Sequence, residues 1–137
     1  MTEPTQKVRL ATYDRDEHRC VSCGADHPLQ YQHRASEGMG GHLARPEMFE
    51  GLTSCASCNP AYEGHLQSAA LAFGWKVRRW VRDQGLADRV PVFYVWERRW
   101  CVLTWDGNRV PVSVALADAL MVDVYGAAEY WRLRELA

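Results

Sequence analysis

Hydrophobic and polar positions alternate along several short stretches of the chain, and this pattern predicts β-strands. The stretch Leu29-Gln30-Tyr31-Gln32-His33 alternates residue by residue, so we expect a short strand that ends at His33. Beyond Gly74 the pattern predicts a three-stranded meander with turns at residues 97–99 and 106–108. Its strands are expected at Val92–Trp96, Trp100–Trp105 and Arg109–Val112.

The sequence predicts three helices, of which the first covers residues 5–15 and ends near the charged turn at residues 14–17. The second is expected to have Asn59 as its N-cap and Pro60 as its first residue, and to stop at Gly74. On this helix Asn59 and Glu63 share a face, whereas His65 lies about 120° away around the axis. A final helix, roughly 114–135, carries one apolar stripe made of Leu116, Leu120, Val124 and Ala127 or Ala128.

The length of 137 residues and the hydrophobic content of 47% predict one domain, or a small domain with an elaboration. We expect the boundary between residues 1–80 and residues 81–137. No run of eighteen apolar residues occurs, and the first residues lack the apolar stretch of a secretory signal. These features predict a soluble, cytoplasmic protein with no membrane partner.

Two Cys-x-x-Cys pairs, Cys20/Cys23 and Cys55/Cys58, are the strongest candidates for metal ligands. Each short pair lets two thiolates wrap one side of a metal ion, and two pairs complete a tetrahedral zinc site. In an intracellular chain such pairs favour metal over disulfides. The alternative is four reduced thiols without a metal. Cys101 lies in a predicted strand and is expected to be a small core residue.

Charge is unevenly distributed, although the net charge is only −1. Residues 20–74 contain two arginines against five acidic residues, whereas residues 75–109 contain eight basic residues against four acidic ones. A basic half suits phosphate binding and an acidic half suits cation binding; chance segregation is the alternative. The tryptophans of the basic half could stack on bases, but the simpler interpretation places them in the core of the meander.

The order and spacing of these motifs over about residues 12–80 resemble an HNH endonuclease. The matching segments are Arg15-Asp16-x3-Cys20-x2-Cys23-Gly24, an extended segment ending in His33, and Leu52-Thr53-Ser54-Cys55-x2-Cys58-Asn59. Gln-His-Arg followed by Gly-Met-Gly-Gly is similar to zinc-knuckle HNH proteins of actinobacterial viruses, which would place the protein in a host cytoplasm. The resemblance implies an α+β fold with a zinc-bound, treble-clef-like ββα-metal core, here extended by the meander and terminal helix.

The resemblance also implies roles for single residues. His33 matches the general base that activates a water, and Glu50 stands where the family has the asparagine that orients this base. Gln32, Asn59 and Glu63 match ligands of a catalytic Mg²⁺ or Mn²⁺, with Ni²⁺ and Zn²⁺ as alternatives. Gln32 is a neutral amide and therefore a weaker ligand than the usual carboxylate. The expected DNA or phosphate contacts are Arg34, His42, His65, Arg78, Arg79 and Arg82.

These observations lead to three hypotheses. The first is a metal-dependent endonuclease that nicks or cleaves double-stranded DNA. The second is a zinc module of the same ancestry that has lost catalysis and binds nucleic acid or a protein partner. Gln32 and Glu50 favour this hypothesis because they depart from the family pattern. The third is a homodimer assembled through the apolar C-terminal helix. A histidine at a strand end is otherwise more often structural than catalytic.

Overall fold

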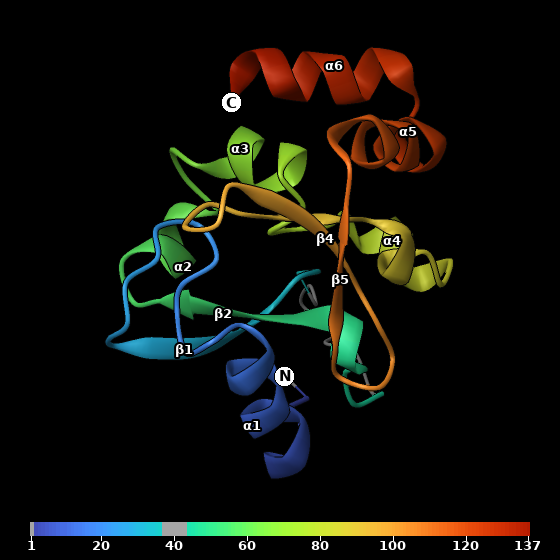
Figure 1. Cartoon of the computed structure of the whole chain (residues 1–137). Coiled ribbons are helices and arrows are strands. Elements are labelled where there is room, and N and C mark those ends of the chain that lie inside the picture. The colour runs from blue at the N-terminus through green and yellow to red at the C-terminus, as the bar shows by residue number, and fades with distance from the viewer. Residues whose placement is uncertain (1, 37–43) are drawn as a thin grey trace.

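A helix and a β-hairpin form the N-terminal part of the computed structural model, which describes residues 2–36 and 44–137 (Figure 1). Helix α1 (Gln6–Arg15) has Thr5 as its N-cap, and the Thr5 side chain accepts a hydrogen bond from the Val8 amide. Strands β1 (Leu29–His33) and β2 (Gly51–Cys55) pair antiparallel, with His33 opposite Gly51. A short 3-10 helix, η1 (Met48–Glu50), leads into β2. The predicted first helix and the strand ending at His33 are confirmed.

A buried ion pair connects α1 to the hairpin and to the C-terminal sheet. The side chains of Arg15 and Asp16 are 1% and 0% exposed and lie 2.9 Å apart. Arg15 also donates to the carbonyl of Gly51 at 2.7 Å. Asp16 accepts from the Thr53 amide at 2.9 Å and from the Tyr94 hydroxyl at 2.6 Å. Buried charges are tolerated when they are paired and fully hydrogen-bonded, so this pair fixes three parts of the chain relative to one another.

The segment after β2 forms two short helices, α2 (Cys58–Ala61) and α3 (Gln67–Ala72), so the single helix predicted from Asn59 to Gly74 is wrong. Asn59 lies inside α2, and Ser57 occupies the N-cap position. The carbonyl of Ala61 accepts hydrogen bonds from the amides of Gly64 and Leu66, at 3.0 and 2.9 Å, which closes a turn. Glycine disfavours a continuous helix because its backbone loses more entropy on ordering than other residues.

The C-terminal part begins with α4 (Arg79–Asp83) and the 3-10 helix η2 (Ala87–Arg89). The meander follows as an antiparallel sheet in the order β3 (Val92–Tyr94), β4 (Arg99–Leu103) and β5 (Arg109–Val112). The predicted meander is confirmed, although β3 and β4 both end two residues earlier than expected. The described residues thus form a mixed α+β structure with six α-helices and two small sheets.

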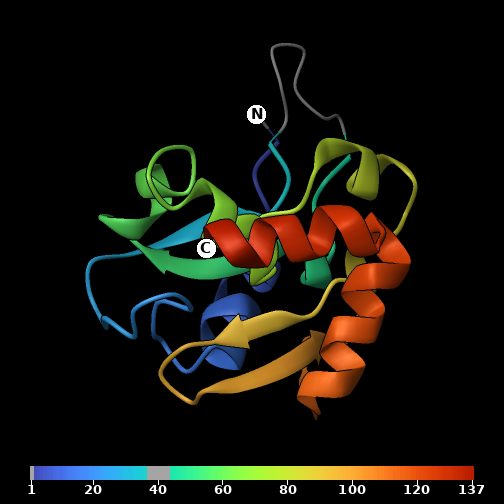
Figure 2. The same cartoon turned by 90° about the horizontal axis from the view of Figure 1, so that it is seen from above.

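The predicted single C-terminal helix is divided at Gly126 into α5 (Val114–Tyr125) and α6 (Ala127–Leu136). Gly126 has a φ of 85°, a conformation that costs glycine little. The chain turns there, and α6 packs on α3 at the opposite end of the molecule from α1 (Figures 1 and 2). Leu116 of the predicted stripe is consequently exposed. The buried residues of the two helices are Ala117, Met121, Tyr130 and Leu133.

Both expected segments, 1–80 and 81–137, contribute to one core. Leu52 and Trp75 from the first pack with Val92 and Leu103 from the second. Trp75 and Trp100 are buried, as the core interpretation predicts, whereas Trp80 and Trp105 are exposed. None of the helices in the described ranges has the length and apolar character needed to cross a membrane.

Candidate metal centre and an adjoining hollow

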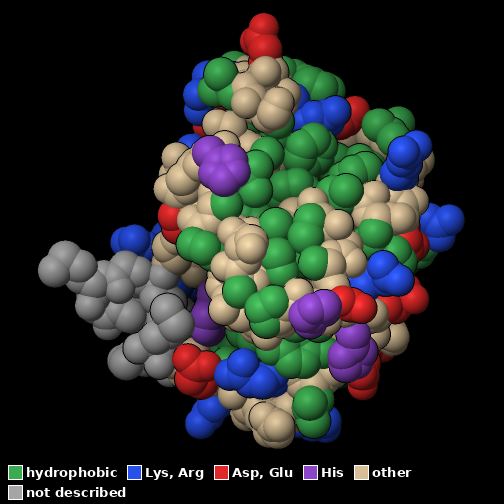
Figure 3. Space-filling model, turned by 90° about the vertical axis from the view of Figure 1, so that its left-hand side faces the viewer, with side chains coloured by type: hydrophobic (Ala, Val, Ile, Leu, Met, Phe, Trp, Pro, Cys, Tyr) green, Lys and Arg blue, Asp and Glu red, His purple; other side chains and the backbone are tan. Residues whose placement is uncertain are grey.

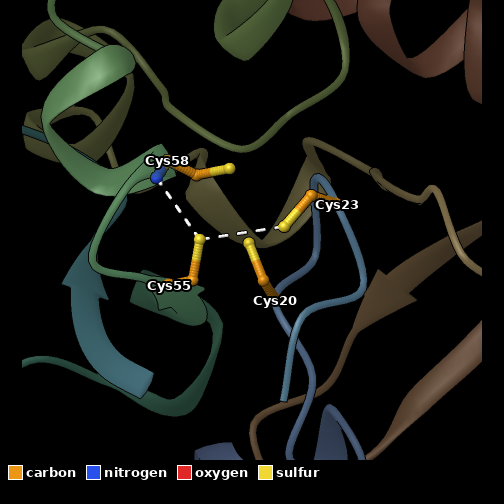
Figure 4. Close-up of side chains that lie close together, drawn as sticks. All are labelled: Cys20, Cys23, Cys55 and Cys58. Carbon is orange, nitrogen blue, oxygen red and sulfur yellow. Dashed lines mark hydrogen bonds between the residues drawn. The ribbon is translucent and has the colours of Figure 1, made fainter. Parts of the chain in front are cut away.

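The four knuckle cysteines converge on one point. Cys20 and Cys23 lie in the turn after α1, whereas Cys55 ends β2 and Cys58 begins α2 (Figure 4). Their sulfur atoms all lie within 4.8 Å of one another. Gly24, with a φ of 80°, donates its amide to the carbonyl of Cys20 at 2.8 Å and so closes the first knuckle.

This spacing fits a metal ion with four sulfur ligands. A tetrahedral site with Zn–S bonds of about 2.3 Å has sulfur–sulfur edges of about 3.8 Å. The sulfur atoms of Cys23 and Cys55 are 3.7 Å apart. The prediction that these cysteines form a group able to hold a metal ion is confirmed. Cys101 lies buried in the meander core, also as predicted.

The environment of the sulfur atoms differs across the cluster. Burial opposes ionisation of Cys20, but the Ser22 hydroxyl and nearby backbone amides favour its thiolate, and its pKa is lowered to about 7. Burial and the neighbouring thiol groups raise the pKa of Cys23 and Cys58. A bound cation favours the thiolate form of every ligand, so metal binding offsets the repulsion between neighbouring thiolates.

A hollow of about 240 Å³ brings together four residues that the sequence predicts as site residues: Gln32, His33, Asn59 and Glu63. Gln32 and His33 come from the end of β1, Asn59 from α2, and Glu63 from the turn after α2. The other described lining residues are Tyr31, Ala35, Ser36 and Lys76. The His33 ring meets the Tyr31 ring edge-on, with centroids 5.2 Å apart.

Most polar groups of this hollow already have partners. The amide nitrogen of Gln32 donates to the carbonyl of Trp75 at 2.9 Å, while its buried amide oxygen has no hydrogen-bond partner among the described residues. The amide nitrogen of Asn59 donates to the side-chain oxygen of Gln30 at 2.9 Å. The Glu63 carboxylate accepts from the Ser36 hydroxyl at 3.2 Å.

Lys76 is a lining residue that the sequence analysis did not select as a site residue. Its ammonium donates to the carbonyl of His33 at 2.9 Å and lies 3.4 Å from the Glu63 carboxylate. Its side chain is only 13% exposed, and this burial lowers its pKa. An isolated parallel bridge between Ala35 and Val77 places it there. The one signal in the sequence that could have drawn attention to Lys76 is the rarity of lysine, since Lys7 is the only other lysine in the chain.

Glu50 lies near His33, and both line a second, smaller hollow together with Arg82. The Glu50 carboxylate accepts from the amide of Glu47 at 2.8 Å and therefore caps η1. The Arg82 side chain is 9% exposed and pairs with Asp83 at 3.0 Å. Little of Arg82 is thus available to DNA, contrary to the sequence-based expectation.

The expected phosphate contact at Arg34 is wrong. This side chain is fully buried, and its guanidinium donates to four backbone carbonyls over 2.8–3.1 Å. The four carbonyls belong to Phe49, Gly74, Ala87 and Val90. Burial lowers the Arg34 pKa to about 10, so the group remains charged at neutral pH. Arg34 therefore acts as an internal cross-link.

Two of the remaining predicted contact residues border a groove of about 170 Å³ that continues from the hollow. Arg78 and Arg79 line it, and the groove shares Ser36, Glu63 and Lys76 with the hollow. Arg79 is exposed and Arg78 is partly exposed.

On the face drawn in Figure 3, hydrophobic side chains gather in the centre and charged side chains of both signs lie toward the edges.

The last two predicted contact residues lie outside these cavities. His65 is exposed in the turn between α2 and α3 and lines none of the three. His42 and the glycine-rich segment around it lie outside the described residues.

Comparisons of the chain with protein-family models, with curated proteins and with solved structures found no match.

Proposed function

We propose that this protein is an HNH-type endonuclease that hydrolyses phosphodiester bonds in DNA, with His33 as the general base. The observation that carries the proposal is the position of His33 at the end of β1, on the wall of the 240 Å³ hollow. The chain order of knuckle, hairpin, knuckle and helix supports a ββα-metal core. Zinc on Cys20, Cys23, Cys55 and Cys58 would have a structural role, since four thiolates close the coordination sphere and leave no position for substrate.

The chemistry required of His33 is proton removal from a water molecule. An imidazole suits this step because its unperturbed pKa lies near neutral pH. The hydrolysis adds the water oxygen to phosphorus and breaks the bond to the leaving oxygen. The hollow is large enough for a water molecule and a phosphate group.

DNA is the substrate that the surrounding charges favour. The groove lined by Arg78 and Arg79 opens directly from the hollow, through the shared residues Ser36 and Lys76. Arginine binds phosphate oxygens through a planar fork of donors, and such contacts supply most sequence-independent affinity for DNA. A phosphate chain lying along this groove would place one phosphodiester beside His33.

The test is cleavage of supercoiled plasmid by the zinc-loaded protein, with and without Mg²⁺ or Mn²⁺, comparing wild type, His33→Ala and His65→Ala. We expect His33→Ala to lower the cleavage rate by about 10²–10⁴-fold, the usual contribution of a general base. His65→Ala is the matched control because this exposed histidine lines none of the three cavities. Equal rates for wild type and His33→Ala would exclude His33 as the base.

A zinc module without catalysis is the second candidate, and the neutral Gln32 beside His33 favours it. In that case the wild-type protein would retard labelled duplex DNA in an electrophoretic assay but cleave it under none of the metal conditions. Cleavage that depends on His33 would exclude this alternative.

A further inference from the structure

The hollow is a poor binding site for the divalent cation that the HNH resemblance implies. Gln32 and Asn59 can offer a cation only their neutral amide oxygens, because their amide nitrogens are hydrogen-bond donors, and the Gln32 oxygen is buried. Glu63 is the single carboxylate among its described lining residues, and it is already paired with Lys76. Mg²⁺ and Mn²⁺ prefer carboxylate oxygens in near-octahedral geometry, so this donor set does not fit them.

Among the described residues, the cysteine cluster is the only group of three or more Cys, His, Asp or Glu side chains close enough to hold a metal ion. The cation that the hollow does contain is the Lys76 ammonium. It is tied to the strand that carries the proposed base, because it donates to the His33 carbonyl at 2.9 Å. Lys76 also borders both the hollow and the arginine-lined groove, so it stands where a phosphate would pass between them.

We propose that the Lys76 ammonium binds the scissile phosphate and takes the place of a divalent cation, so that hydrolysis at His33 needs no added metal. This inference rests on the proposed nuclease function. An ammonium has three hydrogen-bond donors, of which the His33 carbonyl uses one and the Glu63 carboxylate another. The Ser36 hydroxyl also bonds to Glu63, so that carboxylate keeps a partner when Lys76 turns to the phosphate.

The reaction is balanced without a further reactant. His33 takes a proton from water while the water oxygen bonds to phosphorus, and the bond from phosphorus to the leaving oxygen breaks. The leaving oxygen takes a proton from solvent, and His33 later returns its own proton to solvent. Lys76 makes and breaks no covalent bond. Its ammonium donates to a non-bridging oxygen, whose negative charge grows as the pentacovalent transition state forms.

A purely structural role for Lys76 is the competing explanation. Glu63 is 59% exposed, and ion pairs with exposed partners contribute only about 0–1 kcal/mol to stability. A structural lysine would affect folding without touching the bound phosphate. The two explanations therefore differ in salt dependence, because each phosphate contact contributes about 0.9 to the slope of log affinity against log salt concentration.

The experiment compares wild type, Lys76→Met and Lys7→Met, all zinc-loaded, in buffer and DNA stripped of free divalent ions by a chelating resin. Lys7→Met is the control because Lys7 is exposed on α1 and is the only other lysine. Cleavage by wild type is expected to proceed without added metal and to be unaffected by Mg²⁺ or Mn²⁺. Lys76→Met is expected to lower this rate by about 10²–10³-fold, as loss of one transition-state donor does.

Duplex affinity is measured in the His33→Ala background, where cleavage does not interfere. Adding Lys76→Met should reduce the salt slope by about 0.9, whereas Lys7→Met should leave it unchanged. Cleavage that depends on His33 but requires added Mg²⁺ or Mn²⁺ would overturn the Lys76 proposal and leave the nuclease function standing. An unchanged salt slope in the Lys76→Met variant would do the same. Absence of wild-type cleavage under every condition would instead overturn the proposed function, and this inference with it.

Discussion

The guanidinium of Arg34 donates two hydrogen bonds to the carbonyl of Gly74, from Nε at 3.1 Å and from Nη2 at 2.8 Å. Arg34 directly follows β1, whereas Gly74 lies two residues after the end of α3. This link therefore fixes the end of the strand that carries His33 against the segment that carries Lys76. The position of the candidate site depends on a buried arginine that itself has no access to substrate.

Replacement of Arg34 should destabilise the protein strongly. Arg34→Met removes a donor from four carbonyls, and although the Ala87 carbonyl still accepts from the Val90 amide at 3.3 Å, each buried group left unsatisfied costs about 1–3 kcal/mol. Arg34→Lys retains the positive charge, but its single ammonium nitrogen cannot reach all the carbonyls that the planar guanidinium of arginine contacts. We expect both variants to lose about 3 kcal/mol or more in urea unfolding. Arg89→Lys is the control, since Arg89 is 59% exposed, and a comparable loss there would contradict this account.

Much of the fold near the site could be predicted because its signals are local. The Cys-x-x-Cys spacing, the alternation ending at His33 and the turn residues of the meander each lie within a few neighbouring residues. The divisions at Gly64 and Gly126 were harder to predict. Gly64 sits within apolar residues at helical spacing, and Gly126 precedes a helix, α6, that packs back on the distant helix α3.

The composition of the hollow could be predicted only in part. Gln32, His33, Asn59 and Glu63 were expected together because the family resemblance orders them along the chain. Lys76 and the burial of Arg34 depend on the bridge between Ala35 and Val77, which joins residues 42 positions apart. Such long-range pairing has no local periodicity, so an arginine next to His33 was indistinguishable from a phosphate ligand.

Stability should fall at alkaline pH because Tyr94 is buried against a carboxylate. Burial and the adjacent Asp16 raise the pKa of Tyr94 well above its usual value of 10.0. Between pH 10 and the folded-state pKa, the folded chain keeps a proton that the unfolded chain has lost. Stability should therefore be unaffected below about pH 10 and fall above it by about 1.4 kcal/mol per pH unit for this residue.

The Tyr94→Phe variant isolates this effect in urea unfolding at several pH values. It should lose about 1.5–3 kcal/mol at neutral pH, because the hydroxyl bonds to a charged group. Above pH 10 its stability should fall less steeply than that of wild type, so the two curves converge. Tyr13→Phe, at a half-buried position on α1, is the control. Parallel curves for wild type and Tyr94→Phe would contradict the assignment.

Loss of the metal from the cysteine cluster should unfold the N-terminal part of the protein. The two knuckles come from separate turns, and a shared ion would hold them together. We expect one zinc per chain by elemental analysis, and a fall in Tm of about 10 °C or more after chelation. Cys23→Ser should abolish zinc retention, whereas Cys101→Ala should retain a full equivalent because Cys101 lies in the meander core. Equal zinc contents in the two variants would exclude the four-cysteine site.

Two glycines with similar φ angles should respond very differently to substitution. Gly74 and Gly85 have φ angles of 75° and 71°, so alanine pays a similar conformational cost of about 1–2 kcal/mol at either position. A Cβ at Gly74 would lie 1.8 Å from the carbonyl oxygen of Pro91, whereas a Cβ at Gly85 would meet no atom within 4 Å. Because the clash is with backbone, Gly74→Ala must shift the backbone at residue 74, whose carbonyl also accepts from Arg34.

We expect Gly85→Ala to lose about 1–2 kcal/mol in urea unfolding and Gly74→Ala to lose at least about 2 kcal/mol more. Equal losses would show that the approach of Gly74 to Pro91 does not constrain the fold.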